Sequence, residues 1–273
     1  MKVILEPKVT VIAHSQFLGH PDYSIPIDGD GAVQLCAFAA KNCYASFGVD
    51  GRSNIENQKQ VLEMKHGSVL EHFYITVFIE GVTRALTLEL NRHRLLNISQ
   101  RSTRYVAEED SAIVLEPYYA ELYKKYFIGD TSELLKNVNF VAGNEESREY
   151  QIIDRHINSS IASLNEYKVQ VKLLEKINPK NLSGFDLRKW CRGKARNLLP
   201  NGLESKCVYT ANLRAWRWIL EVRSGEGAEP EIRRLAHHLY VALKEVAPLY
   251  FDDFSASHIV DGYPVYIPKY SKV

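Results

Sequence analysis

The sequence lacks the features that identify disulfide-rich, zinc-binding, membrane-spanning and secreted proteins. It contains four cysteines in 273 residues, Cys36, Cys43, Cys191 and Cys207. That number is small for a disulfide scaffold of this length, and the spacing matches no zinc motif, so we expect buried free thiols and no metal site. No stretch approaches the roughly 18 to 20 apolar residues that a membrane helix needs, and the short apolar start is not typical of a signal peptide. We therefore expect a cytoplasmic protein that does not bind membranes.

The chain also lacks an excess of charge of either sign. Its 34 Lys and Arg residues face 33 Asp and Glu residues, which gives a formal net charge of +1. A dedicated nucleic-acid-binding protein is normally much more basic, so we expect no nucleic-acid partner. Any anion that the protein binds is expected to be small.

Helical and strand periodicities alternate along the chain and predict a mixed α/β fold, a small sheet surrounded by many helices. Strands are predicted over 9–13, 69–81 and 206–211, and helices over 32–46, 54–65, 82–91, 116–127, 131–140, 145–176, 186–199, 212–222 and 229–246. Asp30 and Asn212 precede helices as candidate N-caps. No repeat or low-complexity linker interrupts the chain. We expect a single domain over 1–273, with a helical extension around 115–182.

Residues 92–105 concentrate donors for an anion. They read Arg-His-Arg-Leu-Leu-Asn-Ile-Ser-Gln-Arg-Ser-Thr-Arg-Tyr. Guanidinium groups bind phosphate and carboxylate in a bidentate way, and hydroxyl groups complete the shell around such an anion. The helix dipole would explain Arg92 and Arg94 near a predicted helix end, but it does not explain Arg101 and Arg104 in the following loop. The segment indicates a site for a phosphorylated ligand.

Arg92-His93-Arg94, a gap of seven residues and Ser102 together form a motif that resembles the signature of the flavin-dependent thymidylate synthases. Two further blocks are similar to that family, His66 to His72 and Asn212 to Arg223. The three blocks occur in the family's order within roughly residues 8–250. A motif of this length is far more specific than a short glycine pattern.

This resemblance implies an α/β (α+β) fold of the thymidylate synthase-complementing type, with a small mixed, mainly antiparallel sheet surrounded by helices. It implies a methyltransferase that reductively methylates dUMP to dTMP with bound FAD. The carbon donor would be 5,10-methylenetetrahydrofolate and the reductant NADPH. It also implies a homotetramer whose active sites are shared between subunits. Two alternatives stay open: a non-catalytic nucleotide- or nucleic-acid-binding protein that uses the arginine-rich loop, and a flavoprotein of this fold that has lost the use of folate.

Roles for individual residues follow from the same resemblance. It implies that Arg223 is catalytic and stabilises negative charge on the uracil ring. The residues implied around dUMP are Glu89, Arg92, Gln100, Arg101, Ser102, Thr103, Arg104, Arg196 and Arg223. Those implied around FAD are His66, Ser68, Glu71, Arg92, His93, Arg94, Gln100, Asn212, Arg214 and Trp218.

Several of these residues also have a plain structural interpretation. Asn212 suits an N-cap, a role compatible with a flavin contact. Arg188, Arg192 and Arg196 recur every four residues, as on a solvated helix face. Trp218 stands where the family more often has a polar residue, so ring packing would replace a polar contact there. We interpret Ser102 as a ligand of the nucleotide, because the sequence places no base beside it to make it a nucleophile.

Overall fold

The computed structural model describes residues 2–108, 111–127 and 145–273, which group into two compact units. The first unit takes its described residues from Met1–Glu6, Glu80–Leu88 and Gln100–Lys206. The second unit consists of Pro7–Ile79, Glu89–Ser99 and Cys207–Val273. The predicted helix over 131–140 lies outside the described residues.

A four-stranded sheet forms the central β-structure, with the strand order β2-β3-β6-β4. Its strands are β2 (Lys8–His14), β3 (Tyr74–Thr83), β4 (Asn97–Gln100) and β6 (Glu204–Asn212). Along β3, Ile75, Val77 and Ile79 are fully buried and alternate with more accessible residues, the period of a strand that covers a core.

The predicted strand over 69–81 is wrong at both ends. Gly67–His72 form a 3₁₀ helix, η1, and β3 runs through Gly81 to Thr83. Val69 and Leu70 are buried in η1. A short apolar run satisfies a buried helical turn as well as a strand, so periodicity alone could not separate the two.

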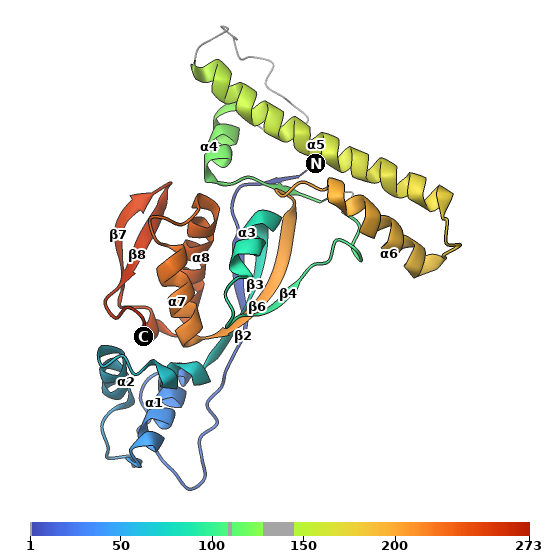
Figure 1. Ribbon diagram of the computed structural model, residues 1–273. Helices are drawn as coiled ribbons and strands as arrows, with labels where there is room; N and C mark the ends of the chain where they lie inside the picture. The colour runs from blue at the N-terminus through green and yellow to red at the C-terminus, as the bar shows by residue number, and fades with distance from the viewer. Residues whose placement is uncertain (1, 109–110, 128–144) are drawn as a thin grey trace. The chain divides into compact units, whose positions relative to one another are not determined.

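In the rest of the second unit, helices pack against a β-hairpin. They are α1 (Gly31–Cys43), α2 (Asn54–Glu63), α7 (Leu213–Arg223), α8 (Pro230–Val246), η3 (Pro248–Tyr250), β7 (Phe254–Val260) and β8 (Tyr263–Pro268). Strands β7 and β8 pair antiparallel, and α7 and α8 both contact β8 (Figure 1). Both predicted N-caps are confirmed, because Asp30 accepts from the Val33 N–H and Asn212 from the Ala215 N–H.

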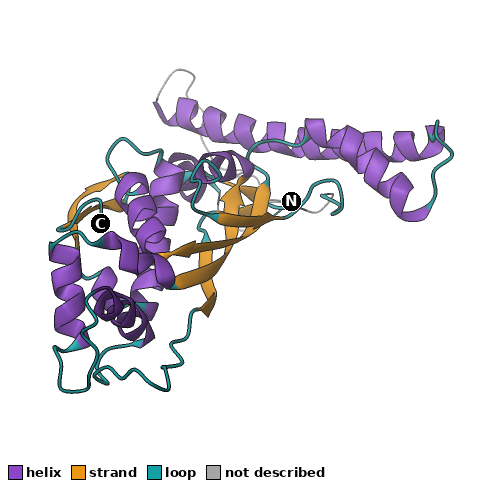
Figure 2. Cartoon of the chain, turned by 60° about the horizontal axis from the view of Figure 1, so that its bottom comes forward, coloured by secondary structure: helices purple, strands orange, loops and turns teal. Residues whose placement is uncertain are grey.

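The first unit is dominated by helices. Its elements include α4 (Pro117–Tyr126), α5 (Glu145–Ile177), α6 (Gly184–Ala195), η2 (Arg196–Leu198) and the parallel pair β1 (Val3–Ile4) and β5 (Ile113–Val114), while α3 (Arg84–Leu90) spans the boundary of the two units. Helix α5 lies alongside α6 (Figures 1 and 2). Its buried stripe includes Ile153 and Ile157, whereas Ile152, predicted on that stripe, is 42% exposed because it lies about 100° away around the helix.

These elements confirm the predicted mixed α/β class. All four cysteines are free thiols, and Cys36, Cys191 and Cys207 are buried as predicted, but Cys43 at the end of α1 is exposed. None of the described helices combines the length and hydropathy that a bilayer crossing requires. Within the described residues, no cluster of His, Cys, Asp and Glu side chains could hold a metal ion.

Candidate active site

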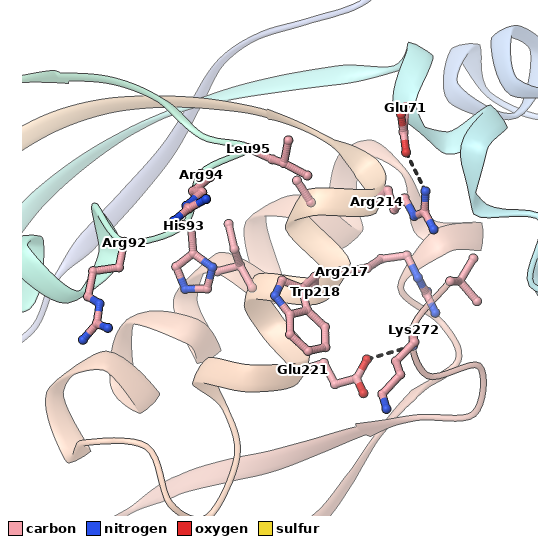
Figure 3. A pocket seen from close by; sticks show the side chains of 13 residues that line it. Glu71, Arg92, His93, Arg94, Leu95, Arg214, Arg217, Trp218, Glu221 and Lys272 are labelled. Atoms are coloured by element: carbon pink, nitrogen blue, oxygen red, sulfur yellow. Dashed lines mark hydrogen bonds and ion pairs between the residues drawn. The ribbon is translucent and has the colours of Figure 1, made fainter.

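A cavity of about 550 Å³ opens beside α7 in the second unit (Figure 3). Its wall combines the turn after α3, one face of α7 and the segment after β8. The lining residues are Glu71, Arg92, His93, Arg94, Leu95, Arg214, Ala215, Arg217, Trp218, Ile219, Glu221, Lys272 and Val273. Six of the ten residues that the sequence predicts around FAD therefore share this wall: Glu71, Arg92, His93, Arg94, Arg214 and Trp218.

The charge on this wall is mainly positive. Arg92, Arg94 and Lys272 are exposed, and their side chains make no ion pair or hydrogen bond with any residue that the structure describes. Arg214 forms an ion pair with Glu71 at 2.6 Å between Nη1 and Oε1, and both side chains remain more than 40% exposed. Unpaired cations at a cavity wall favour an anionic ligand.

Two tryptophans of α7 have opposite environments. Trp216 is fully buried and donates from Nε1 to the carbonyl of Ile75 at 3.1 Å. Trp218 lies about 200° further around the helix, is 46% exposed and borders the cavity (Figure 3). An accessible indole offers a face on which a flat ring stacks. This position fits the ring packing that the sequence predicts for Trp218.

Arg223, at the end of α7, is held by three hydrogen bonds from its guanidinium group. Nε donates to Nε2 of His93 at 2.9 Å, Nη1 to Oε2 of Glu89 at 3.1 Å and Nη2 to the Glu89 carbonyl at 3.2 Å. A guanidinium has five N–H donors, so two are left without a partner among the described residues. The structure thus orients Arg223 and leaves donors for another acceptor.

The environment of His93 keeps its ring neutral. Burial, and then the nearby Arg223 charge, lower the pKa of His93 to about 4. A neutral ring leaves Nε2 as an acceptor, as the hydrogen bond from Arg223 requires.

The other residues predicted around FAD lie outside the α7 cavity. His66 and Ser68 line a second cavity of the same unit, about 560 Å³, with walls from α1, α2 and η1. Asn212 is 7% exposed, and its side-chain oxygen caps α7 at 2.9 Å from the Ala215 nitrogen. Gln100 belongs to the first unit, where its Nε2 donates to Thr87 at 3.0 Å and to Ser205 at 2.8 Å.

Arg101 of the first unit has an internal partner. Its Nη2 atom donates to the Glu108 carboxylate and, at 2.9 Å, to the Ser111 hydroxyl. The Glu108 side chain is 1% exposed, so this pair is largely removed from water. Glu108, which was not predicted from the sequence, balances the charge of Arg101 within the chain.

The next three residues form a turn beside α6. The Ser102 hydroxyl accepts from the Arg104 N–H at 3.3 Å, and the Ser102 carbonyl accepts from the Tyr105 N–H at 3.2 Å. Thr103 is buried at 6% exposure. Within the described part of the chain, no basic side chain bonds the Ser102 hydroxyl, and neither Arg104 nor Arg196 has a side-chain partner.

The part of the wall that comes from residues after β8 was not predicted from the sequence. Lys272 and Val273 border the cavity, and Glu221 of α7 accepts from the Lys272 N–H at 3.2 Å. Glu221 could have been inferred, because it lies three residues after Trp218 and seven after Arg214, on the helix face that those two predicted residues share. Lys272 carries no local signal.

Comparison with known proteins identifies the family. Residues 27–249 match the family model described as thymidylate synthase complementing protein. The flavin-dependent thymidylate synthase of Mycobacteroides abscessus is 33% identical over 270 residues, which cover 98% of this chain and 97% of that protein. That of Mycobacterium avium is 34% identical, over 96% of this chain and 95% of its own. The chain belongs to the flavin-dependent thymidylate synthase family.

Solved structures show the same fold at lower identity. The UMP/dUMP methylase PolB from Streptomyces cacaoi, bound with 5-Br dUMP, superposes with a TM-score of 0.60 at 17% identity, over 92% of this chain and 96% of its own. Thymidylate Synthase X from Helicobacter pylori, with FAD and dUMP, gives 0.55 at 20% identity, over 90% and 98%. These similarities confirm the predicted fold, and the relatives confirm the predicted family.

Proposed function

We propose that this chain is a thymidylate synthase that methylates dUMP to dTMP with bound FAD. Family membership supports the reaction, and the α7 cavity is the structural observation that carries the assignment, because it gathers six residues expected around the flavin. We also propose 5,10-methylenetetrahydrofolate as carbon donor and NADPH as reductant. These two co-substrates rest on the family resemblance alone.

The residues at the α7 cavity fit the chemistry of FAD. Arg92, Arg94 and Arg214 present cations to an anionic ligand, and Trp218 presents an accessible aromatic face. His93 and Glu71 add polar groups to the same wall. FAD, when bound, supplies the two-electron transfer that a reductive methylation requires. His66, Ser68, Gln100 and Asn212 remain proposed flavin residues.

Arg223 carries the proposed catalytic role. C5 of uracil is a weak nucleophile, and among the described residues no cysteine lines the α7 cavity to activate it by addition. The free N–H donors of Arg223 would stabilise negative charge that develops on the pyrimidine ring. Glu89 and His93 hold the guanidinium in place, so little reorganisation accompanies the reaction.

The phosphate of dUMP calls for cations and hydroxyl groups. Ser102 and Arg104 offer these in one turn, and Arg196 offers another unpaired guanidinium. We keep the full predicted set around dUMP as part of the proposal: Glu89, Arg92, Gln100, Arg101, Ser102, Thr103, Arg104, Arg196 and Arg223. Arg101 would have to bind the nucleotide while it also pairs with Glu108.

The proposal includes the organisation of the protein. The whole chain would act as one thymidylate synthase domain with a helical extension around 115–182, since the family match over 27–249 includes residues of both units. It would assemble as a homotetramer with shared active sites, in the cytoplasm, without a nucleic-acid or membrane partner.

The decisive experiment follows tritium from dUMP labelled at C5. The purified protein should release tritium to water and form dTMP only when methylenetetrahydrofolate, NADPH and FAD are all present. Arg223→Gln should lower turnover by about 100-fold or more, the effect of removing a preorganised donor at a developing charge. Arg188→Gln changes an exposed arginine of α6 and is the matched control. A colourless protein that binds oligonucleotides with strong salt dependence would instead support a nucleic-acid-binding module.

A further inference from the structure

The segment Lys269–Val273, which follows β8, is fastened to α7. Arg217, whose side chain is 3% exposed, donates from Nη2 to the Tyr270 carbonyl at 2.9 Å. The same guanidinium pairs with Asp253 at 2.6 Å, and Asp253 accepts from the Tyr270 N–H at 3.1 Å. A buried charge pair with this many bonds fixes the backbone at Tyr270.

One turn further along α7, Glu221 holds the next two residues. Its carboxylate accepts from the Ser271 hydroxyl and, at 3.2 Å, from the Lys272 N–H. Lys272 has a φ of 59°, in the left-handed region that a lysine rarely adopts. Since tertiary contacts impose this backbone conformation, the fold fixes the position of Lys272.

The end of this segment packs against η1. Val273 is 4% exposed, and its backbone lies against Gly67, where an added Cβ would come within 2.5 Å of the Val273 carbonyl carbon. The glycine therefore permits the close approach of two backbones.

This anchoring places Lys272 at the cavity with its charge unmatched. Lys272 lines the α7 cavity (Figure 3), and its ammonium forms no ion pair with the residues that the structure describes. Glu221, a carboxylate on the same wall, is engaged by Ser271 and by the Lys272 N–H. Lys269, in the same segment, differs: its Nζ lies 4.9 Å from the centre of the Tyr270 ring, and it does not line the cavity.

We propose that Lys272 is a further cofactor-binding residue, whose ammonium contacts the diphosphate of FAD from a wall built by residues 269–273. The inference rests on the proposed function, because it takes FAD as the occupant of the α7 cavity. The diphosphate is the part of FAD that carries formal negative charge, and an ammonium group pairs best with such a compact anion.

The test compares FAD with riboflavin, which lacks both the diphosphate and the adenosine of FAD. Dissociation constants of FAD and riboflavin are measured by flavin fluorescence for the full chain and for Lys272→Met, Lys272→Arg and Lys269→Met. Lys272→Met should weaken FAD binding about tenfold and leave riboflavin within about twofold of the wild type, since riboflavin lacks the phosphates. Lys272→Arg should restore most of the affinity, and Lys269→Met should bind like the wild type.

Each outcome has a distinct meaning. A wild-type protein that fails to bind FAD contradicts the proposed function and this inference together. If the wild type binds FAD and Lys272→Met binds it with the same affinity, the inference about Lys272 is wrong and the proposed function is unaffected. Equal weakening of FAD and riboflavin also overturns it, because that pattern reports a distorted cavity. A parallel titration with dUMP distinguishes the FAD diphosphate from the dUMP phosphate as the partner of Lys272. A selective loss of dUMP affinity would assign Lys272 to the nucleotide and reject the FAD contact.

Discussion

Arg223 and His93, 130 residues apart in sequence, are joined by a hydrogen bond of 2.9 Å from Nε of the arginine to Nε2 of the histidine. The bond requires that Nε2 carry no proton, so the neutral ring holds its proton on Nδ1. The catalytic arginine that we propose is therefore positioned by a titratable partner.

We expect His93 to titrate near pH 4 in the folded protein, because burial and the Arg223 charge lower its pKa. In the unfolded chain its pKa returns to about 6.5, so the unfolded state binds more protons between these values. The contribution of His93 to stability is thus complete above about pH 6.5 and is lost as the pH falls toward 4. NMR titration of the His93 ring measures the pKa directly. In Arg223→Gln it should rise, and a wild-type midpoint near 6.5 would contradict the prediction.

Ser102→Ala should weaken dUMP binding and retain turnover. Its hydroxyl accepts a single bond, from the Arg104 N–H, and no base in the described part of the chain bonds it. Loss of one hydrogen bond to an ionised phosphate should raise the KM for dUMP by about tenfold. Steady-state kinetics at saturating dUMP should give a kcat within about threefold of the wild type, on the same reasoning. Complete loss of chemistry with intact dUMP binding would make Ser102 a participant in the reaction.

Gly67→Ala should destabilise the protein and loosen the wall of the cavity. A Cβ there would lie 2.5 Å from the Val273 carbonyl carbon and 3.0 Å from Nε of Arg214. We expect a loss of about 1–3 kcal/mol in the free energy of unfolding, the usual range for overpacking. Gly31→Ala is the matched control, because nothing lies within 4 Å of its added Cβ. Urea denaturation measures the free energy of unfolding of both variants. Equal values would contradict the prediction and show that the Val273 backbone shifts without cost.

Asn212→Ala should cost about 1 kcal/mol of stability, since the side chain caps α7 through the Ala215 N–H. Asn212→Asp should restore most of that loss, because aspartate is an equally good N-cap. Thermal unfolding compares the three proteins. If Asn212→Asp is as unstable as Asn212→Ala, capping is not what Asn212 contributes.

The features that could be predicted from sequence are those with local causes. The caps at Asp30 and Asn212 act over three residues, and the arginine signature lies within residues 92–102, so both are visible in the chain. The β7–β8 hairpin was missed although it carries a local signal. Its turn is Asp261-Gly262, with φ of 49° and 78°, a dipeptide that favours tight hairpins.

The contacts that escaped prediction join distant or irregular segments. Lys272 reaches the cavity because Arg217 bonds the Tyr270 carbonyl and Glu221 bonds the Lys272 N–H, each from some 50 residues earlier in the chain. No periodicity records such a contact. Glu108 pairs with Arg101 from within a loop, where neither the helical nor the strand period applies. Long-range tertiary contacts of this kind need the folded backbone.

Helix α7 packs against the core on one side and borders the cavity on the other. Trp216 and Leu220 are buried in the core, while Trp218 and Glu221 border the cavity from the opposite side. Inserting or deleting one residue would turn everything beyond it by about 100° and move these side chains out of their present environments. Across evolution this helix should accept changes of side chain yet keep its length, so an alignment of relatives should show its gaps elsewhere.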